Sequence, residues 1–174
     1  MDSQLWYTLL IGAVSVERIA ELIVSQRNAS WALQQNGVET GQGHYPPMVL
    51  LHTGLLAACL LETYLIDRPF VPALGWAMLA LVLGAQALRW WCITTLGRQW
   101  NTRVIVVPGL ALVRAGPYRW LRHPNYLAVV IEGIALPLVH TAWVTALAFT
   151  VLNAVLLLRF RIPAEDHALA SASA

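Results

Sequence analysis

Five long apolar segments constrain what this chain can fold into. A helix needs about 20 apolar residues to cross the roughly 30 Å hydrocarbon core of a bilayer, and all five segments reach or approach that length. Charged residues make up 11% of the chain, whereas a soluble domain carries about 25%. The sequence therefore predicts an all-α integral membrane protein with about five transmembrane helices. The segments cover residues 5–24, 48–66, 70–96, 126–139 and 142–158.

The last two apolar segments are separated by a turn of only two or three residues, near His140 and Thr141. Helices joined by so short a connection lie antiparallel. We therefore expect a tight helical hairpin, which is tilted or spans incompletely because residues 126–139 are few. The chain has no internal repeat, so residues 1–174 are predicted to form a single membrane domain.

All eleven basic residues are arginines, and their distribution predicts the orientation of the chain. Inner loops of membrane proteins are enriched in basic residues. If the N-terminus lies outside, only Arg68 remains on the outer side, and loop 97–125 and the C-terminus share the inner side. Because the arginines border apolar segments and do not follow a soluble basic face, we expect membrane lipids as partners and no nucleic acid. The arginines expected inside are Arg27, Arg98, Arg103, Arg114, Arg119, Arg122, Arg159 and Arg161.

The tetrapeptide His-Pro-Asn-Tyr at 123–126 opens the fourth apolar segment. Proline is favoured in the first turn of a helix. The unpaired backbone N–H groups and the positive pole of the helix there suit an anionic or hydroxyl-bearing ligand. Tyr118, Arg119 and Arg122 lie just before it. The alternative interpretation is an arginine-rich anchor at the inner membrane border.

A second polar cluster follows the fifth apolar segment and contains Arg159, Arg161, Glu165 and Asp166. Pro163 disrupts a regular helix, so either the fifth helix kinks there or a new helix begins with Pro163 in its first turn. With five passes, both polar clusters emerge on one side of the membrane. Together they could hold a zwitterionic, positively charged cofactor. The alternative is an ordinary membrane exit with a solvated acidic pair.

Charged residues inside the apolar segments predict internal ion pairs. Glu132 lies about one and a half turns into the fourth segment, a depth at which a carboxylate must pair or face a cavity. Arg89 and Arg161 are its candidate partners. A further group with helical spacing is expected to turn toward the bundle interior, to line a cavity or to brace helices. It consists of Glu17, Arg18 and Glu21.

Residues 25–47 are predicted to form the loop between the first two helices. The segment carries Trp31 and Tyr45 among glycines and amides. Aromatic residues are enriched at the headgroup level of the bilayer, which favours an interfacial helix. The alternative is a lid over a lipid-facing cavity.

The two cysteines, Cys59 and Cys92, fall within apolar segments. Their spacing matches neither a CxxC motif nor a Cys/His metal site. We therefore expect small core residues, and no metal ion at the site.

The two polar clusters together resemble those of the isoprenylcysteine carboxyl methyltransferase family. R-H-P-N-Y at 122–126 is similar to the family's R-H-P-x-Y element, and R-I-P-A-E-D at 161–166 is similar to its closing R-x-x-x-E-E element. The resemblance covers roughly residues 85–169. The N-terminal half looks like a bacterial branch that accompanies type III polyketide synthases and O-methylates long-chain alkylpyrones or alkylresorcinol-like products.

The resemblance implies a multi-pass enzyme of the bacterial inner membrane that binds S-adenosylmethionine on its cytoplasmic side. Residues 1–84 would supply the N-terminal helices and the substrate-side loop, and residues 85–169 the cofactor-binding methyltransferase core. The acceptor would be a lipophilic carboxylate, pyrone enol or phenol that enters from the bilayer. No metal is needed, because the sulfonium is already an activated methyl donor.

The resemblance also implies roles for individual residues. Arg161 matches the position that faces the acceptor, where it would orient an ionised oxygen and stabilise its charge. His123 would be the base for a weakly acidic phenol. Asp166 stands where the family has the second glutamate, and Ala128 stands where glycine is frequent. The positions that match the cofactor site are Leu110, Ala111, Leu112 and Val113, which form a strand-like segment, with Tyr118, His123, Pro124, Asn125, Tyr126 and Glu165.

Three alternative functions follow from the same residues. One is a methyltransferase for prenylcysteine or phospholipid acceptors. A second is a membrane reductase, because sterol reductases carry a similar H-P-x-Y element; it predicts NADPH, and the R-x-x-x-E-D ending argues against it. The third is a non-enzymatic bundle that binds or transports a lipid, with the arginines acting only as topology signals. The oligomeric state is left open.

Overall fold

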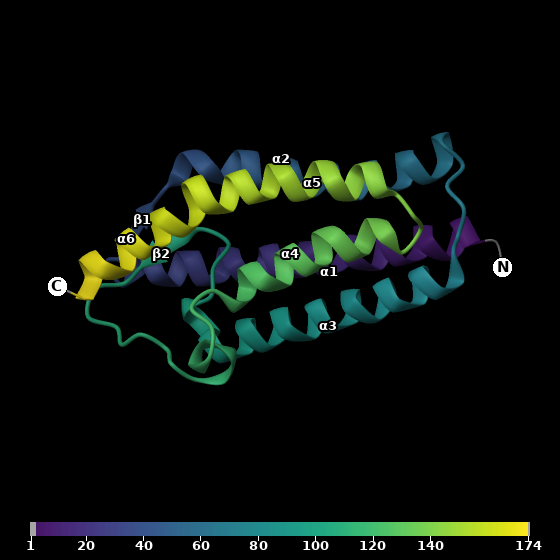
Figure 1. Ribbon diagram of the computed structural model, residues 1–174. Coiled ribbons are helices and arrows are strands. Elements are labelled where there is room, and N and C mark those ends of the chain that lie inside the picture. Colours follow the sequence, from purple (N-terminus) through teal and green to yellow (C-terminus); the bar gives the residue numbers. More distant parts are fainter. Residues whose placement is uncertain (1–2, 174) are drawn as a thin grey trace.

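Long helices lie side by side along one axis of the molecule in this computed structural model, which describes residues 3–173 (Figure 1). The start of α1 and the end of α6 lie at opposite ends of the bundle. Helix α5 continues through a π-helical turn into α6. The helices are α1 (Ser3–Gln34), α2 (Tyr45–Leu65), α3 (Pro72–Leu96), α4 (Pro124–Leu138), α5 (Trp143–Leu156) and α6 (Ile162–Ser173).

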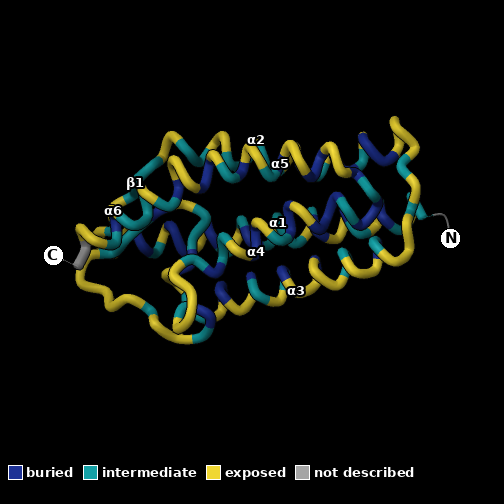
Figure 2. Tube along the Cα trace, viewed as in Figure 1, coloured by how far each residue is buried: buried dark blue, intermediate teal, exposed yellow. Residues whose placement is uncertain are grey.

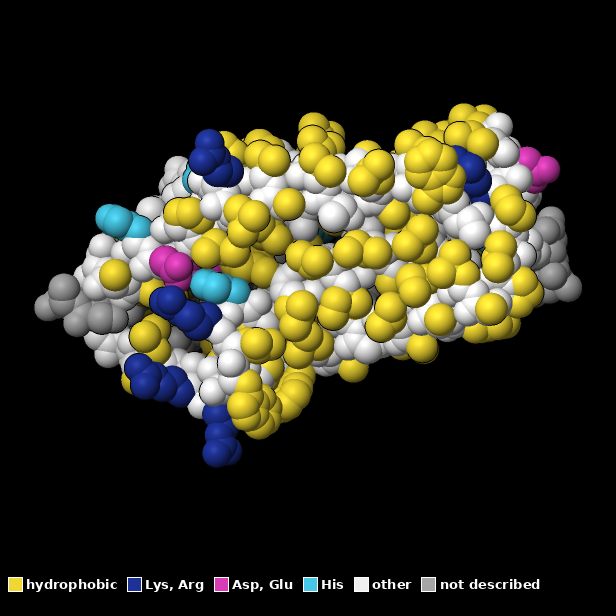
Figure 3. Space-filling model, in the orientation of Figure 1, with side chains coloured by type: hydrophobic (Ala, Val, Ile, Leu, Met, Phe, Trp, Pro, Cys, Tyr) yellow, Lys and Arg dark blue, Asp and Glu magenta, His cyan; other side chains and the backbone are white. Residues whose placement is uncertain are grey.

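The protein is an all-α membrane protein, as the sequence predicts. Within residues 3–173, three helical stretches are long and apolar enough to cross a bilayer: Gln42–Leu65, Pro72–Gln99 and Trp143–Ser171. The surface supports this assignment, because large apolar side chains cover the middle of the bundle while arginines gather at the α6 end (Figure 3). Leu50 and Leu65 are 74% and 78% exposed, which suits contact with lipid chains. The total number of spans stays a prediction.

The first helix is longer than the sequence predicts. Residues 25–34, expected in a loop, continue α1 to Gln34. Their polar side chains are satisfied by a distant segment: the Asn28 amide donates to the Trp100 backbone carbonyl at 2.7 Å, and the Ser25 hydroxyl donates to Asn101 at 2.8 Å. The expected interfacial helix is therefore the end of α1, and Trp31 faces the guanidinium of Arg98.

Two short strands pair with each other at the α6 end of the bundle. β1 (Val38–Thr40) pairs antiparallel with β2 (Val104–Val106), and Glu39 lies opposite Ile105. The strand-like segment expected at 110–113 has no regular secondary structure. Three 3-10 turns complete this end: η1 (Gln42–His44), η2 (Gly97–Gln99) and η3 (Gly116–Arg119).

The tight hairpin between α4 and α5 is confirmed. Thr141 adopts a positive φ of 55°, and the Ala142 N–H donates to the Pro137 carbonyl at 3.0 Å, which closes the turn. The helices approach closely at Gly133, where an added Cβ would overlap the ring of Phe149.

The core lies along the axis of the bundle, beneath the exposed outer faces of the helices (Figure 2). The buried Tyr7 hydroxyl donates to the Leu136 carbonyl at 3.0 Å, which joins α1 to α4. Cys59 and Cys92 are fully buried, in agreement with the prediction of core residues. Other core members are Ile11, Val14, Leu55, Val82, Val129, Val139 and Phe149.

A π-helical turn, η4 (Leu157–Arg161), separates α5 from α6. In a continuous α-helix the ring of Pro163 would clash with the carbonyl of Arg159. The wider turn precedes it, and Pro163 falls in the first turn of α6, one of the two outcomes that the sequence predicts. Such turns occur often at functional sites, and this one holds Arg161 in the interior, 4% exposed.

Candidate functional site

A cavity of about 890 Å³ lies within the bundle and reaches the α6 end. Binding sites for small molecules usually fall between about 300 and 1,000 Å³. Its walls come from α1, α2, α3, α5, β2, the 107–123 segment, the start of α4, η4 and α6. The cavity therefore joins the two polar clusters that stand far apart in the sequence.

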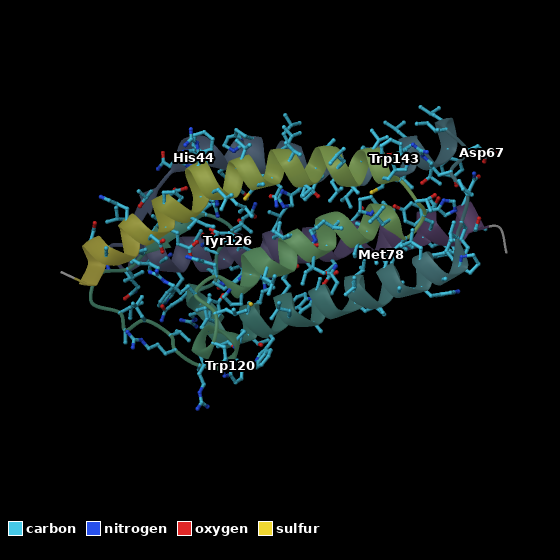
Figure 4. All side chains as sticks on the ribbon, in the orientation of Figure 1. His44, Asp67, Met78, Trp120, Tyr126 and Trp143 are labelled. Carbon is cyan, nitrogen blue, oxygen red and sulfur yellow. The ribbon has the colours of Figure 1, made fainter. Side chains whose placement is uncertain are left out.

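The two clusters meet at the α6 end of this cavity, which we call the mouth and define by His123, Tyr126, Glu165 and Asp166. The Tyr126 hydroxyl donates a hydrogen bond to the Glu165 carboxylate. Nδ1 of His123 lies 3.7 Å from Glu165, and Nε2 lies 3.2 Å from Asp166. Figure 4 shows Tyr126 in this part of the bundle and Asp67 at the opposite end.

The electrostatics of the mouth favour a protonated histidine. The Glu165 carboxylate, followed by that of Asp166, raises the pKa of His123 above its ordinary value, although partial burial acts in the other direction. Burial also raises the pKa of the Tyr118 hydroxyl, which therefore stays neutral. When His123 is protonated, the mouth combines a cationic imidazole with two carboxylates, and it can meet both signs of charge on a zwitterion.

Arg161 lies deeper in the cavity than the mouth. Its guanidinium donates to the Thr102 carbonyl at 2.8 Å. Its Nε is buried without a hydrogen-bond partner among the described residues. A buried cation with a free donor is a favourable neighbour for an anionic oxygen.

A buried ion-pair network forms the inner end of the cavity. Arg18 lies 2.7 Å from Glu21 and 3.3 Å from Glu132. Arg89 contacts Glu132 and lies 3.6 Å from Glu21. Glu132 therefore pairs with Arg89, one of its two candidate partners, and not with Arg161. The predicted inward turn of residues 17–21 is confirmed for Arg18 and Glu21, which both line the cavity.

The structure brings most of the sequence-predicted site residues to one cavity. Ala111 is exposed, and Pro124 is buried at the start of α4; neither lines the cavity. The roles of all these residues stay predictions. Those that line the cavity are Leu110, Leu112, Val113, Tyr118, His123, Asn125, Tyr126, Arg161 and Glu165.

The sequence-based set misses several polar residues that line the cavity, among them His52 on α2 and Asn153 on α5. Both lie within apolar segments. The sequence already carries this signal, since a polar group inside a membrane helix must face a partner or a cavity.

These features define a helical membrane protein with an internal cavity, and titratable side chains line the mouth of that cavity at one end of the bundle. The chain belongs to the isoprenylcysteine carboxyl methyltransferase (ICMT) family, whose model matches residues 78–171. The family is one of membrane methyltransferases.

Two relatives align over nearly the whole chain. The Bacillus subtilis (strain 168) protein "Uncharacterized protein YpbQ" is 39% identical over 164 residues, which cover 94% of this chain and 96% of the relative. An "Uncharacterized protein" from Haemophilus influenzae (strain ATCC 51907 / DSM 11121 / KW20 / Rd) is 24% identical over 168 residues, 95% of each chain. The likeness therefore extends beyond the matched family region into α1 and α2.

Proposed function

We propose that this protein is an S-adenosylmethionine-dependent O-methyltransferase that acts on a lipophilic acceptor. The observation that carries the proposal is the meeting of His123, Tyr126 and Glu165 at the mouth of a cavity that also contains Arg161. Membership of the family supports the reaction class.

The residues of the mouth fit the proposed cofactor. S-adenosylmethionine carries a sulfonium, an ammonium group, a carboxylate and ribose hydroxyls. Glu165 and Asp166 supply negative charge for the cations, and His123 supplies positive charge for the carboxylate. The buried side-chain oxygen of Asn125 lines the cavity and has no partner among the described residues, so it can accept a hydrogen bond from a hydroxyl or ammonium group.

The main contribution of the protein to the reaction is to position the reactants. When bound, S-adenosylmethionine supplies an activated methyl group that passes to the acceptor oxygen, leaving S-adenosylhomocysteine. Arg161 would hold that oxygen in its ionised form and orient it. A carboxylate or an acidic pyrone enol needs no base, whereas a phenol would give its proton to His123 in its neutral form.

The acceptor proposed first is a long-chain alkylpyrone or alkylresorcinol-like phenol, and a prenylcysteine or phospholipid acceptor is the alternative. The cavity supports an amphiphile, because polar residues at the mouth and apolar residues from α2 and α5 line the same space. In this proposal the mouth faces the cytoplasm of a bacterial inner membrane, since arginines gather at its end of the bundle.

Labelled S-adenosylmethionine tests the proposal directly. Membranes that contain the protein are incubated with the labelled cofactor and with candidate alkylpyrones, alkylphenols, fatty acids and prenylcysteine analogues, and the labelled products are identified. We expect label on an oxygen of an alkylpyrone or alkylphenol. Label on a prenylcysteine would favour the alternative acceptor, and no protein-dependent transfer to any of these acceptors would contradict the proposed function.

A further inference from the structure

The inner part of the cavity differs from the mouth in its chemistry. We define this inner compartment by Arg18, Glu21, His52, Arg89 and Asn153, which line the cavity. Asn153 stands eight positions before Arg161 on the continuous helical run from α5 through η4 to α6, so its backbone lies farther from Glu165 than that of Arg161 does. The compartment therefore lies beyond Arg161 as seen from the mouth.

The charges of the inner compartment neutralise one another. Arg18 and Arg89 are matched by Glu21 and by Glu132, at the separations given above. A network paired in this way offers no net charge to a ligand. Consequently, the inner compartment carries no net charge that would select an anion, and its neutral side chains, His52 and Asn153, can contact an uncharged ligand group.

His52, which lines this compartment, carries a hydrogen-bond acceptor. Its Nδ1 lies 2.8 Å from the backbone carbonyl of Met48. A carbonyl only accepts hydrogen bonds, so Nδ1 must carry a proton. In the neutral ring, Nε2 is then unprotonated and can accept a hydrogen bond. The edge-on contact with Phe149, 5.4 Å between ring centroids, holds the imidazole in place.

Asn153 offers both kinds of hydrogen bond. It is 2% exposed, and its side-chain oxygen is buried without a partner among the described residues. It stands one turn after Phe149 on α5, so it shares the helix face that packs toward His52. An unpartnered amide is unfavourable in a membrane interior, and a ligand group would satisfy it.

We propose that the inner compartment binds a second, uncharged oxygen of the acceptor, a hydroxyl or a carbonyl, through Nε2 of His52 and the amide of Asn153. This inference rests on the proposed function and narrows its substrate class. The acceptor is an amphiphile whose head carries one acidic oxygen, held near Arg161, and one neutral oxygen held deeper. Single-oxygen heads leave His52 and Asn153 unsatisfied and bind more weakly.

Two acceptors that differ by one hydroxyl test this proposal: 5-pentadecylresorcinol and 3-pentadecylphenol. We measure the affinity of each for the purified protein in detergent, and separately its rate of methylation. The wild type is expected to bind the resorcinol about tenfold more tightly, as one or two neutral hydrogen bonds allow. His52→Leu and Asn153→Leu should each reduce the preference to about twofold or less, and His52→Gln, which keeps an acceptor atom, should retain most of it.

The two readouts separate this inference from the proposed function. Methylation of both acceptors with equal wild-type affinity overturns the inference and leaves the function standing. A binding preference that His52→Leu and Asn153→Leu remove, without methyl transfer to either acceptor, supports the inner compartment and contradicts the function. Affinity for S-adenosylmethionine serves as the folding control, since neither residue lies at the mouth. A preference that persists in both leucine variants also overturns the inference.

Discussion

The Tyr126 hydroxyl, in the first turn of α4, donates a hydrogen bond to the Glu165 carboxylate in the first turn of α6. In the sequence, Tyr126 lies at the start of the α4–α5 hairpin and Glu165 lies beyond its end. The bond orients the carboxylate of Glu165, which lines the cavity. The proposed cofactor site therefore depends on how the last three helices pack.

Tyr126→Phe tests this dependence. Removal of the hydroxyl leaves Glu165 without a neutral donor to orient it, so we expect affinity for S-adenosylmethionine to fall about tenfold, in line with a hydrogen bond to a charged group. Equilibrium binding of the labelled cofactor measures the effect. Tyr64→Phe is the matched control, because Tyr64 bonds to Thr8 at the far end of the bundle. Equal losses in both variants would contradict a local role.

Arg161→Met should separate cofactor binding from methyl transfer. If Arg161 holds the ionised acceptor oxygen, the variant loses roughly 10²–10³-fold in kcat, as enzymes do when a donor to a developing or held oxyanion is removed. Cofactor affinity should change less than about threefold. Arg159→Met, which alters the neighbouring exposed arginine, controls for net charge. A similar fall in kcat for both variants would argue against a specific role of Arg161.

The pKa of His123 predicts a pH-dependent contribution to stability. Because Glu165 and Asp166 raise this pKa in the folded protein, the contribution is complete below the ordinary histidine pKa of about 6.5 and is lost as pH rises through the raised value. The difference in Tm between the wild type and His123→Asn should therefore be larger at about pH 6 than at about pH 9. Thermal unfolding in detergent measures it. A difference that grows with pH would have the wrong sign.

Packing of the hairpin can be tested at a single glycine. Gly133→Ala places a methyl group into the ring of Phe149, and we expect a loss of about 1–3 kcal/mol from overpacking. Gly84→Ala, on α3, meets no atom within 4 Å and should raise stability by up to about 1 kcal/mol through helix propensity. Thermal unfolding of both variants checks the pair. Equal effects would contradict close contact between α4 and α5.

Apolar segments predict the membrane helices well, because the thickness and the apolar interior of the bilayer determine the length and the composition of a helix that crosses it. Residues 70–96, for example, coincide with α3 except for two residues at the start. That Glu132 pairs with an arginine also follows from the cost of isolated charges in a membrane, whereas the choice of Arg89 over Arg161 comes from the structure. Both predictions rest on local features of the chain.

Structural features that depend on contacts between residues far apart in the sequence could not be predicted from the sequence. Residues 25–34 are polar enough to suggest a loop, yet Asn28 finds its partners in the 97–100 segment and the helix continues. The β1–β2 pair is only three residues long on each side and has no periodic signal. His52 and Asn153 become recognisable as a pair only when α2 and α5 are seen to share a cavity.

The central claim is that the start of α4 and the start of α6 form one S-adenosylmethionine site, and binding of the labelled cofactor to purified protein tests it most directly. The wild type should bind saturably. Glu165→Gln should reduce affinity at least about tenfold, because it removes a carboxylate from the mouth. Asp166→Asn, the more exposed neighbour, should reduce affinity less. Wild-type protein that does not bind the cofactor, or a Glu165→Gln variant that binds it as tightly as the wild type, would contradict the claim.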